Sequence, residues 1–275
     1  MVCPNWQAMR MKHIDFDPDI ARVAHLLADA ARRVILPYFR SVDLNTDNKE
    51  SAGFDPVTEA DRAAERAMRA ILAEQRPSDA ILGEEYGPKE GTSGLTWVLD
   101  PIDGTRGFIS GTPTWGVLIA VSDGDGPFYG VIDQPYIGER FEGSPAGATL
   151  TGPLGTNALG TRASRDLSAA TVLTTFPEVG STADQNGFHA VASGARLTRY
   201  GMDCYGYALL AAGQVDLVIE AGLAPYDIQG PIAVVQAAGG IVTDWQGGPA
   251  HAGGRALAAA NPEIHAQALG ILRDY

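Results

Sequence analysis

WVLDPIDGT, residues 97–105, is the stretch that says most about how this 275-residue chain folds. Its apolar first part, Trp97 to Leu99, predicts a strand that delivers Asp100 and Asp103 into a tight turn made with proline and glycine. A strand end keeps both carboxylates out of the core, where an unpaired charge is costly. The turn can therefore direct both side chains at one cation. Either aspartate alone would equally suit a turn that caps local N–H groups.

Further carboxylates follow other predicted strands. Glu84 and Glu85 come after the apolar run 80–82, and Asp227 lies between a strand and the start of a helix, where it would also suit an N-cap. Like charges that a fold brings together repel each other unless a cation sits among them. Carboxylate ligands favour Mg²⁺ over zinc, and the five histidines show no metal-ligand spacing. The pattern predicts a magnesium site that serves phosphoryl transfer to water.

The charge balance excludes one large class of function. With 20 Lys and Arg against 33 Asp and Glu, the net charge is −13, whereas a nucleic-acid binder needs a basic surface. A bound phosphate must be reached through cations or backbone N–H groups. No uninterrupted apolar run approaches 18 residues, and the N-terminus lacks the apolar core of a signal peptide. We therefore expect a cytoplasmic protein with no membrane span.

The rest of the chain predicts an alternation of helices and strands. Helices are predicted over 17–38, from a capping box at 58–61, near 205–212, near 228–238 and after Pro262. Strands are predicted at 80–82, 96–99, 115–121, 128–132, 140–142, 171–175, 216–219, 241–243 and 257–260. Pro231 is expected within the first turn of its helix, the one place where proline is tolerated.

The Gly/Pro/Thr-rich stretch 143–161 predicts a boundary or a hairpin. We place a soft domain division there, with an α+β half over 1–150 that carries most metal ligands. The second half, 151–275, is predicted to be α/β and to carry the substrate-side residues and the last metal ligand.

Four motifs occur together in a characteristic order. They are Asp55–Asp61, Gly83–Glu85, Asp100–Thr105, and Tyr226-Asp227 with Gly239-Gly240. In this order they resemble the signature of the inositol monophosphatase family, and the resemblance spans residues 49 to 244. Asp-Gly-Thr alone would be a weak signal, but four separated motifs are a strong one. The resemblance implies an α/β fold, a layered αβαβα sandwich of the inositol-monophosphatase/fructose-bisphosphatase type, with the site in the cleft between its halves.

The resemblance also implies how each motif residue acts. Two or three Mg²⁺ ions would be bound by the carboxylates of Glu84, Asp100, Asp103 and Asp227 and by the carbonyl of Ile102. The N–H groups of Gly104 and Thr105 would hold the phosphate, and the Thr105 hydroxyl and Asp61 would orient a metal-activated water and remove its proton. Glu85 is expected to support Glu84, and Lys49 to balance the carboxylates. The family also implies a homodimer.

Two rival phosphoryl-transfer classes lack their motifs here. A haloacid-dehalogenase-type phosphatase needs two aspartates one residue apart before Gly-Thr, whereas Asp100 and Asp103 have two residues between them. No Gly-x-x-x-x-Gly-Lys-[Ser/Thr] loop is present, so an ATPase or kinase would lack its phosphate cradle.

Two more acids indicate the substrate. Asp203 and Glu220 are not needed for the metals and predict a cationic substrate group; Arg199, in the same region, is counted with the substrate-side residues. In these residues the chain is similar to the histidinol-phosphate phosphatase branch, whose substrate carries an ammonium and an imidazolium group. The alternative is that Asp203 caps the helix through Ala212 and pairs with Arg199.

The expected activity is therefore Mg²⁺-dependent hydrolysis of L-histidinol phosphate to L-histidinol and phosphate, a step of histidine biosynthesis. An inositol-1-phosphatase, or a broader sugar- or nucleotide-phosphate phosphatase, is the alternative enzyme. A non-catalytic metal- or phospholigand-binding module is the alternative of another class.

Overall fold

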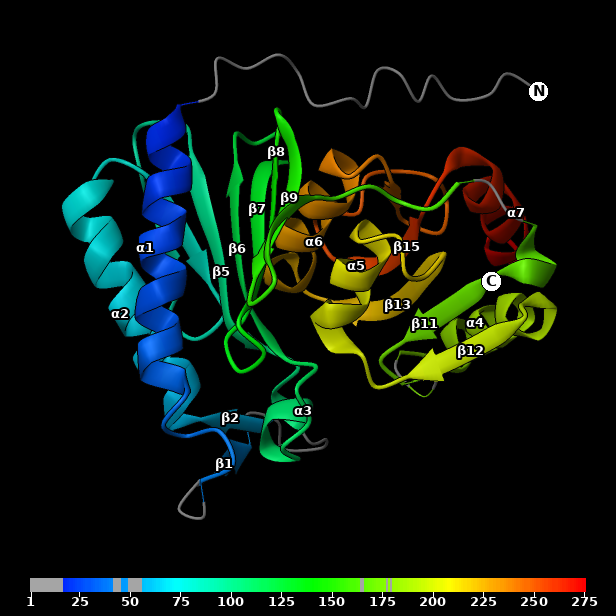
Figure 1. Ribbon diagram of the computed structural model, residues 1–275, viewed down its shortest axis with the longest axis horizontal. Coiled ribbons are helices and arrows are strands. Elements are labelled where there is room, and N and C mark those ends of the chain that lie inside the picture. Colours follow the sequence, from blue (N-terminus) through cyan, green and yellow to red (C-terminus); the bar gives the residue numbers. More distant parts are fainter. Residues whose placement is uncertain (1–16, 42–45, 49–55, 164–165, 177, 179) are drawn as a thin grey trace.

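Two large sheets, a two-stranded ribbon and seven α-helices make up the described part of the chain. The structure, a computed structural model, describes residues 17–41, 46–48, 56–163, 166–176, 178 and 180–275. The layers run from the pair α1 (Pro18–Ile35) and α2 (Glu59–Gln75), through the larger sheet, to a middle helix layer and then the smaller sheet (Figure 1). Two outer helices complete the sandwich. This confirms the predicted αβαβα fold.

The larger sheet has eight strands and carries the motif-bearing β5 near one side. Its order is β10 (Gly155–Ala158), β9 (Gly147–Gly152), β8 (Glu139–Ser144), β7 (Pro127–Gln134), β6 (Gly116–Ser122), β5 (Thr96–Asp103), β3 (Ala80–Gly83) and β4 (Gly87–Lys89). Only the β3–β5 pair is parallel. Because β3 and β5 are parallel neighbours, Glu84 and Asp100 emerge at the same edge of the sheet.

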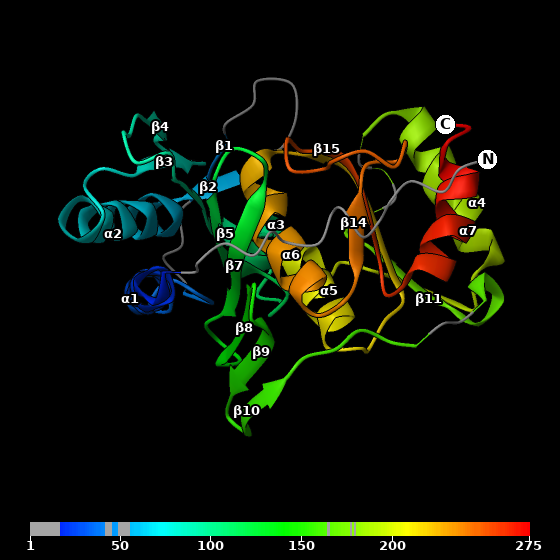
Figure 2. The same cartoon turned by 90° about the horizontal axis from the view of Figure 1, so that it is seen from above.

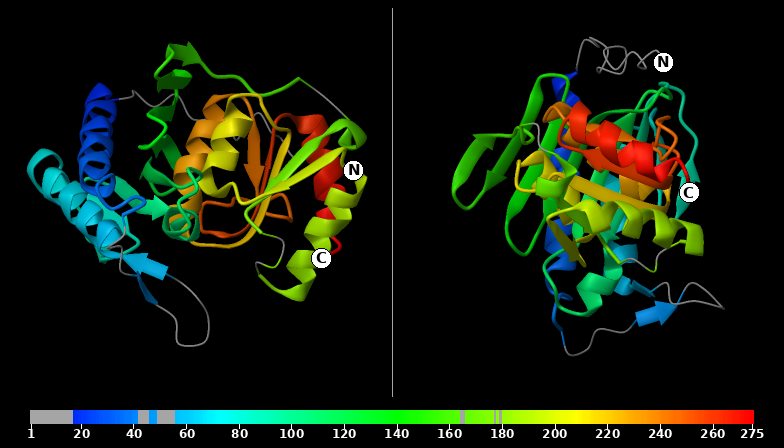
Figure 3. Two further views of the ribbon diagram at one scale, coloured as in Figure 1. Left: turned by 60° about the horizontal axis from the view of Figure 1, so that its bottom comes forward. Right: turned by 90° about the vertical axis from the view of Figure 1, so that its right-hand side faces the viewer.

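The smaller sheet has five strands, in the order β12 (Leu197–Tyr200), β11 (Thr171–Thr174), β13 (Leu217–Leu223), β15 (Gly254–Ala259) and β14 (Ile241–Thr243). The middle layer consists of α5 (Asp203–Ala211) and α6 (Pro225–Ala237), on the opposite side of the larger sheet from α1 and α2 (Figure 2). Helices α4 (Thr182–Gly194) and α7 (Pro262–Leu272) lie together on the outer face of the smaller sheet (Figure 3). No helix in the described ranges is long and apolar enough to cross a membrane.

Three short elements, β1 (Thr46–Asn48), β2 (Pro56–Thr58) and α3 (Thr105–Ile109), lie close to the end of β5. The ribbon is formed by β1 and β2, and α3 follows β5 directly. A short 3₁₀ helix, Leu167–Ala169, precedes β11.

The first two helices begin where their caps predict. The Asp17 carboxylate accepts the N–H of Asp19 at 3.0 Å, with proline next in the chain. At the start of α2, Thr58 and Asp61 form the predicted capping box. The apolar face of α1 is buried against α2 and the larger sheet. Helix α1 ends at Ile35, before Pro37, and a turn replaces the predicted last residues of the helix.

Helix α6 corrects one sequence prediction. It begins at Pro225 rather than near Ile228, so Pro231 lies inside the helix and not in its first turn. Gly230, next to Pro231, is also unfavourable inside a helix. Glycine suits this position because a Cβ there would lie 3.3 Å from the carbonyl oxygen of Val131 and 3.4 Å from that of Ile119. The helix backbone packs directly on the larger sheet, and this close packing outweighs low helix propensity.

The stretch 143–161 is mostly strand and not a simple boundary. It contains β9 and β10, which form a hairpin on the larger sheet. The chain changes sheets between Ala158 and Thr171, not at residue 150. The division into two domains stays a prediction. Sequence patterns missed α4 and β12, because α4 buries only Gly187, Phe188 and Val191 and β12 is a mostly exposed edge strand.

The buried side chain of His265 predicts how the free energy of unfolding falls at acid pH. The Thr243 hydroxyl donates to the Asp244 carbonyl at 2.7 Å and so accepts from His265 Nε2 at 2.9 Å. Burial lowers the pKa of His265 to about 4, so the folded protein resists protonation that the unfolded chain accepts below about pH 6.5. Stability is full above that pH and falls as the pH drops toward 4, by about 2 kcal/mol at pH 5.

His265→Gln keeps a donor for Thr243 but does not titrate. We expect this variant to lose less free energy of unfolding than the wild type between pH 8 and pH 5, as measured by urea denaturation. The difference at pH 8 reports packing alone, because His265 is neutral there in both states. Parallel pH curves for the two proteins would contradict the assignment.

Candidate active site and metal centre

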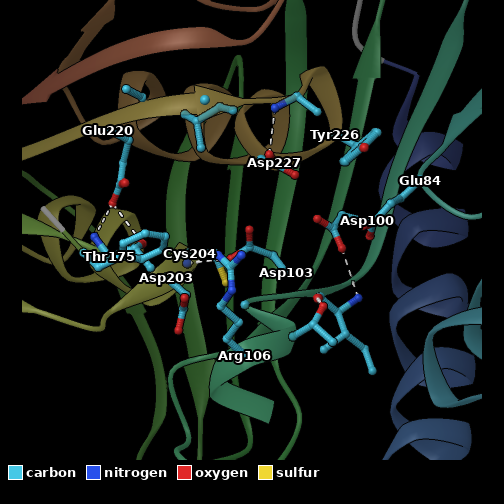
Figure 4. Close-up of a pocket in the computed structure, with 18 of the residues that line it drawn as sticks. Glu84, Asp100, Asp103, Arg106, Thr175, Asp203, Cys204, Glu220, Tyr226 and Asp227 are labelled. Carbon is cyan, nitrogen blue, oxygen red and sulfur yellow. Dashed lines mark hydrogen bonds between the residues drawn. The ribbon is translucent and has the colours of Figure 1, made fainter. Parts of the chain in front are cut away.

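A pocket of about 950 Å³ opens where β5 and α3 meet the ends of β13, α5 and α6 (Figure 4). It lies between the two sheets, in the cleft that the sequence analysis expected. Nine of the predicted site residues line it: Glu84, Asp100, Ile102, Asp103, Gly104, Thr105, Asp203, Glu220 and Asp227. Residues more than 140 positions apart in the chain thus face one cavity.

The end of β5 and the turn at Gly104 are fixed by local hydrogen bonds, and β5 runs to Asp103, so both aspartates lie at the end of the strand and not in the predicted turn. Asp100 Oδ1 accepts the N–H of Ile102 at 3.0 Å, and the Thr105 hydroxyl donates to the Ile102 carbonyl at 3.1 Å. Gly104 has a φ of 80°, a left-handed conformation that glycine adopts without a Cβ penalty. The pairing of β5 with β6 shifts register between Asp100 and Asp103. This irregularity lets both carboxylates reach the pocket although they are three residues apart.

A third carboxylate joins them from the N-terminus of α6. Single oxygens of Asp100, Asp103 and Asp227 all lie within 4.8 Å of one another. Asp227 also caps its own helix, because its Oδ2 accepts the N–H of Ala224 at 2.7 Å. The N-cap alternative is therefore wrong in position: Ala224 is the N-cap, and Asp227 caps the helix from its third residue while it also belongs to the cluster.

The electrostatics of the cluster fit a cation. Burial raises the pKa of Asp100 well above its ordinary value, and the charges of Glu84, Asp103 and Asp227 raise it further. Burial likewise raises the pKa of Asp103, with Asp227 and Asp203 adding to the shift. A divalent cation would remove this repulsion, and an oxygen-only set of donors suits Mg²⁺.

Cys204 does not change that ligand character. Its backbone N–H donates to Asp103 Oδ2 at 2.7 Å. Burial and the charge of Asp103 raise the pKa of its thiol well above the usual value. Among the described residues, the side chains that converge are Asp100, Asp103 and Asp227, so this group offers oxygen donors alone.

Asp61 lies beside the acids but is not among the described residues that line the pocket. Burial raises its pKa to about 7, and the charges of Glu84 and Glu85 contribute, while hydrogen bonds from Thr58 oppose the shift. Its Oδ2 accepts both the N–H and the hydroxyl of Thr58. Glu85 is also outside the lining, and Lys49 lies outside the described residues.

The substrate-side acids take different positions. Asp203 Oδ2 accepts the Thr114 hydroxyl at 2.8 Å, and the residue has a φ of 45°, which is rare for a non-glycine residue. The first turn of α5 receives no side-chain cap. No ion pair joins Asp203 to Arg199, which is exposed on β12 and outside the described pocket lining. The alternative reading of Asp203 as a helix cap paired with Arg199 is therefore wrong.

Glu220 faces the pocket from β13. Its Oε1 accepts the N–H and the hydroxyl of Thr175 at 2.7 and 3.0 Å, as Figure 4 shows, and its Oε2 accepts the Thr174 hydroxyl at 3.3 Å. Burial raises the pKa of Glu220 to about 8 against these hydrogen bonds, and the charge of Asp203 adds to the shift. Two acids thus stand on the pocket wall, and the charge of Asp203 acts on Glu220.

Sequence reasoning missed several residues of the site, and two of them make a contact of their own. Arg106 and Phe176 line the pocket, and the guanidinium lies 5.2 Å from the centre of the Phe176 ring. The charge of Arg106 also opposes the effect of burial on the pKa of Asp203. Arg106 directly follows the Asp-Gly-Thr motif, so its position was a usable signal. Nothing in the sequence near Phe176 points to the pocket.

Known proteins match this chain over most of its length. The profile of the inositol monophosphatase family matches residues 18–275. The bifunctional phosphatase IMPL2, chloroplastic, of Arabidopsis thaliana is 41% identical over 263 residues, 92% of this chain and 74% of that protein. A histidinol-phosphatase of Streptomyces coelicolor is 34% identical, over 93% of this chain and 97% of that one.

Solved structures agree. The structure of an inositol monophosphatase from Zymomonas mobilis is 39% identical and has a TM-score of 0.83, over 93% of this chain and 98% of its own. The family generally depends on Mg²⁺, in keeping with the acidic cluster. The chain therefore belongs to the inositol monophosphatase family of phosphatases, as its four motifs predicted.

Proposed function

We propose that this protein hydrolyses L-histidinol phosphate to L-histidinol and phosphate in a Mg²⁺-dependent reaction. Membership of a phosphatase family supports phosphomonoester hydrolysis. The name of the Streptomyces coelicolor relative, histidinol-phosphatase, supports the substrate. The single observation that carries the proposal is the pair of acids, Asp203 and Glu220, on the wall of a pocket that already holds an acidic cluster.

The acidic cluster would hold the metal. Its ligands would be the carboxylates of Asp100, Asp103, Asp227 and Glu84 and the carbonyl of Ile102. Mg²⁺ in such a site polarises phosphoryl oxygens and lowers the pKa of water. Its binding would also relieve the repulsion that raises the pKa of Asp100 and Asp103.

The residues around the cluster would orient the reactants. The N–H groups of Gly104 and Thr105 begin α3, and the first N–H groups of a helix have no partner within it, so they would donate to phosphate oxygens. The Thr105 hydroxyl donates to the Ile102 carbonyl, which leaves its lone pairs to accept from the attacking water. Asp61, whose carboxyl group lies close enough to Glu84 for the charges to interact, would accept the proton of that water.

The two wall acids would select a cationic substrate. Burial raises the pKa of both Asp203 and Glu220, so each gains from a positive group placed near it. L-Histidinol phosphate offers an ammonium and an imidazolium group, whereas inositol phosphates offer only hydroxyl groups. Charge-assisted hydrogen bonds to these acids would therefore favour histidinol phosphate.

A substrate comparison tests the proposal. We expect kcat/KM for histidinol phosphate to exceed that for inositol 1-phosphate by at least about tenfold at saturating Mg²⁺, the effect of about 1.4 kcal/mol. Equal values would favour a broader phosphatase. Failure to hydrolyse any phosphomonoester with Mg²⁺ present would leave a module that only binds metal or phospholigands.

Asp203→Asn tests the cation contact. Asparagine keeps an acceptor for Thr114 but removes the charge, so we expect kcat/KM for histidinol phosphate to fall about 10- to 100-fold, the effect of one charged hydrogen bond. The value for inositol 1-phosphate should change much less, because that ester has no cationic group. Equal losses on both esters would return Asp203 to a structural role.

A further inference from the structure

The loop that carries Glu84, residues 84–86 between β3 and β4, is held by a buried carboxylate on α2. The Glu65 side chain is fully buried. Its Oε2 accepts the N–H of Glu85 at 2.7 Å, and its Oε1 accepts the N–H of Tyr86 at 3.3 Å. These two amides directly follow Glu84 in the chain. The carboxylate therefore fixes the backbone on the C-terminal side of Glu84.

Arg69, one turn further along α2, completes the contact. Its Nε donates to Glu65 Oε1 at 2.7 Å, and its guanidinium also donates to the Gly87 carbonyl. On the other side of the loop, the N–H of Glu84 donates to the Leu99 carbonyl at 3.2 Å. Leu99 directly precedes Asp100, so the backbone of Glu84 is tied both to α2 and to the strand that carries the metal cluster.

Glycine at position 83 leaves room for the Glu65 carboxylate. A Cβ on Gly83 would lie 2.0 Å from Glu65 Oε1 and 2.8 Å from Arg69 Nη2. Gly83 does not have a positive φ, so its backbone does not require glycine. Glycine is needed here because the Glu65 carboxylate passes directly over the end of β3.

The cost of this arrangement indicates a function beyond stability. A buried ion pair gains little net free energy, because desolvation of the charges offsets their attraction, and apolar residues of similar size often stabilise the fold as well or better. Apolar residues would, however, leave the N–H groups of Glu85 and Tyr86 without their acceptor. What the ion pair supplies is a defined loop conformation.

We propose that Glu65 is a positioning residue for the metal site, which holds the loop so that the Glu84 carboxylate faces Asp100. Figure 4 shows these two carboxylates next to each other. The proposal rests on the proposed function, because it takes Glu84 as a metal ligand. Glu65 itself does not line the pocket in the described part of the chain and acts through the loop.

Glu65→Gln tests this role. Both oxygens of the Glu65 carboxylate accept hydrogen bonds. Glutamine replaces one of them with an NH₂ group, which cannot accept a hydrogen bond, so part of the contact with the loop is lost. We expect the dissociation constant of Mn²⁺ or Mg²⁺, measured by isothermal titration calorimetry, to rise about 10- to 100-fold, as is usual when a residue supporting a metal ligand is changed. The Mg²⁺ concentration for half-maximal activity should rise in step, while kcat at saturating Mg²⁺ falls less.

Asp216→Asn is the matched control. Asp216 is equally buried and accepts a backbone N–H, from Thr171 at 2.9 Å, and an arginine, Arg162 at 2.8 Å. It precedes β13, at the end of that strand away from the pocket. We expect this variant to lower the melting temperature without changing the dissociation constant of the metal.

Gly83→Ala gives a second variant in case Glu65→Gln does not fold. Its methyl group would push the Glu65 carboxylate from the loop, so metal affinity should fall as in Glu65→Gln. The positioning role is overturned if the wild type binds metal and both variants bind it equally well. Absence of saturable metal binding by the wild type would overturn the proposed function together with this inference.

Discussion

Asp100→Asn is expected to reduce phosphatase activity at least about 1,000-fold and to leave the fold intact. Asp100 is buried between Glu84, Asp103 and Asp227, and the three aspartates converge within 4.8 Å. A metal ion contributes several kcal/mol to catalysis, and about 4 kcal/mol corresponds to that factor. Steady-state turnover at saturating Mg²⁺ checks the expected loss.

The same change should not destabilise the protein without metal. Asparagine keeps the acceptor for the Ile102 N–H and removes one of several mutually repelling charges. We expect the melting temperature in the presence of EDTA to equal or exceed that of the wild type. Added Mg²⁺ should stabilise the wild type by mass action and the variant much less.

Asp79→Asn is a matched control for this prediction. Asp79 is as buried as Asp100, but it lies before β3, at the other end of the sheet from Glu84, and bonds Trp97 Nε1 at 2.9 Å and Arg76 at 2.8 Å. Its loss should lower stability and spare turnover. Wild-type activity in Asp100→Asn, or an equal loss in Asp79→Asn, would refute a metal site at Asp100.

The parts of the site that lie on local motifs could be predicted from the sequence. An apolar run ending in Asp-Pro-Ile-Asp-Gly-Thr specifies both a strand and the turn that follows it, because these depend on residues close in the chain. The capping box at Thr58 and Asp61 is equally local. Convergence of these motifs on one cavity was inferred from the family resemblance and not from spacing.

The parts that depend on long-range packing could not be predicted. The glycines in Asp-Gly-Thr-Arg-Gly indicate a close approach at Gly104 and Gly107, but not what approaches. The structure shows that it is Asp203, whose Cγ would lie 2.6 Å from a Cβ on Gly104. Asp203 adopts a positive φ above this turn, where its carboxylate accepts the Thr114 hydroxyl, and not the helix-cap geometry that its local sequence suggests.

Helix α6 shows the same limit. Its sequence, with Gly230 and Pro231 near the middle, has poor helix propensity, so periodicity placed its start too late. Glycine is found at position 230 because this part of α6 packs closely against β7 of the larger sheet. Glycine on both elements lets the helix backbone approach the sheet, and the sequence of neither element alone reveals the pairing.

Gly130→Val is therefore expected to have a large effect on stability although it lies outside the pocket. A Cβ at Gly130, on β7, would lie 2.6 Å from the Gly230 carbonyl oxygen and 2.8 Å from the Ala233 Cβ. The carbonyl is backbone and cannot rotate away, so α6 must move off the sheet. We expect a loss of about 3 kcal/mol in the free energy of unfolding, at the upper end for overpacked cores, or roughly 6–12 °C in melting temperature.

The displacement should also reach the active site, because α6 carries Asp227 near its N-terminus, in the acidic cluster. We expect weaker Mn²⁺ binding by calorimetry in the folded Gly130→Val protein. Gly152→Val, on β9 of the same sheet, is the control: the nearest atom to its Cβ is Cγ of the Glu139 side chain at 3.1 Å, which can rotate away. Its effect should stay within about 1 kcal/mol, the span of strand propensities, and its metal affinity should match the wild type. Similar stability losses in the two variants would mean that the loss comes from placing valine in a strand of this sheet. The contact between β7 and α6 would then not be what holds Asp227 in place.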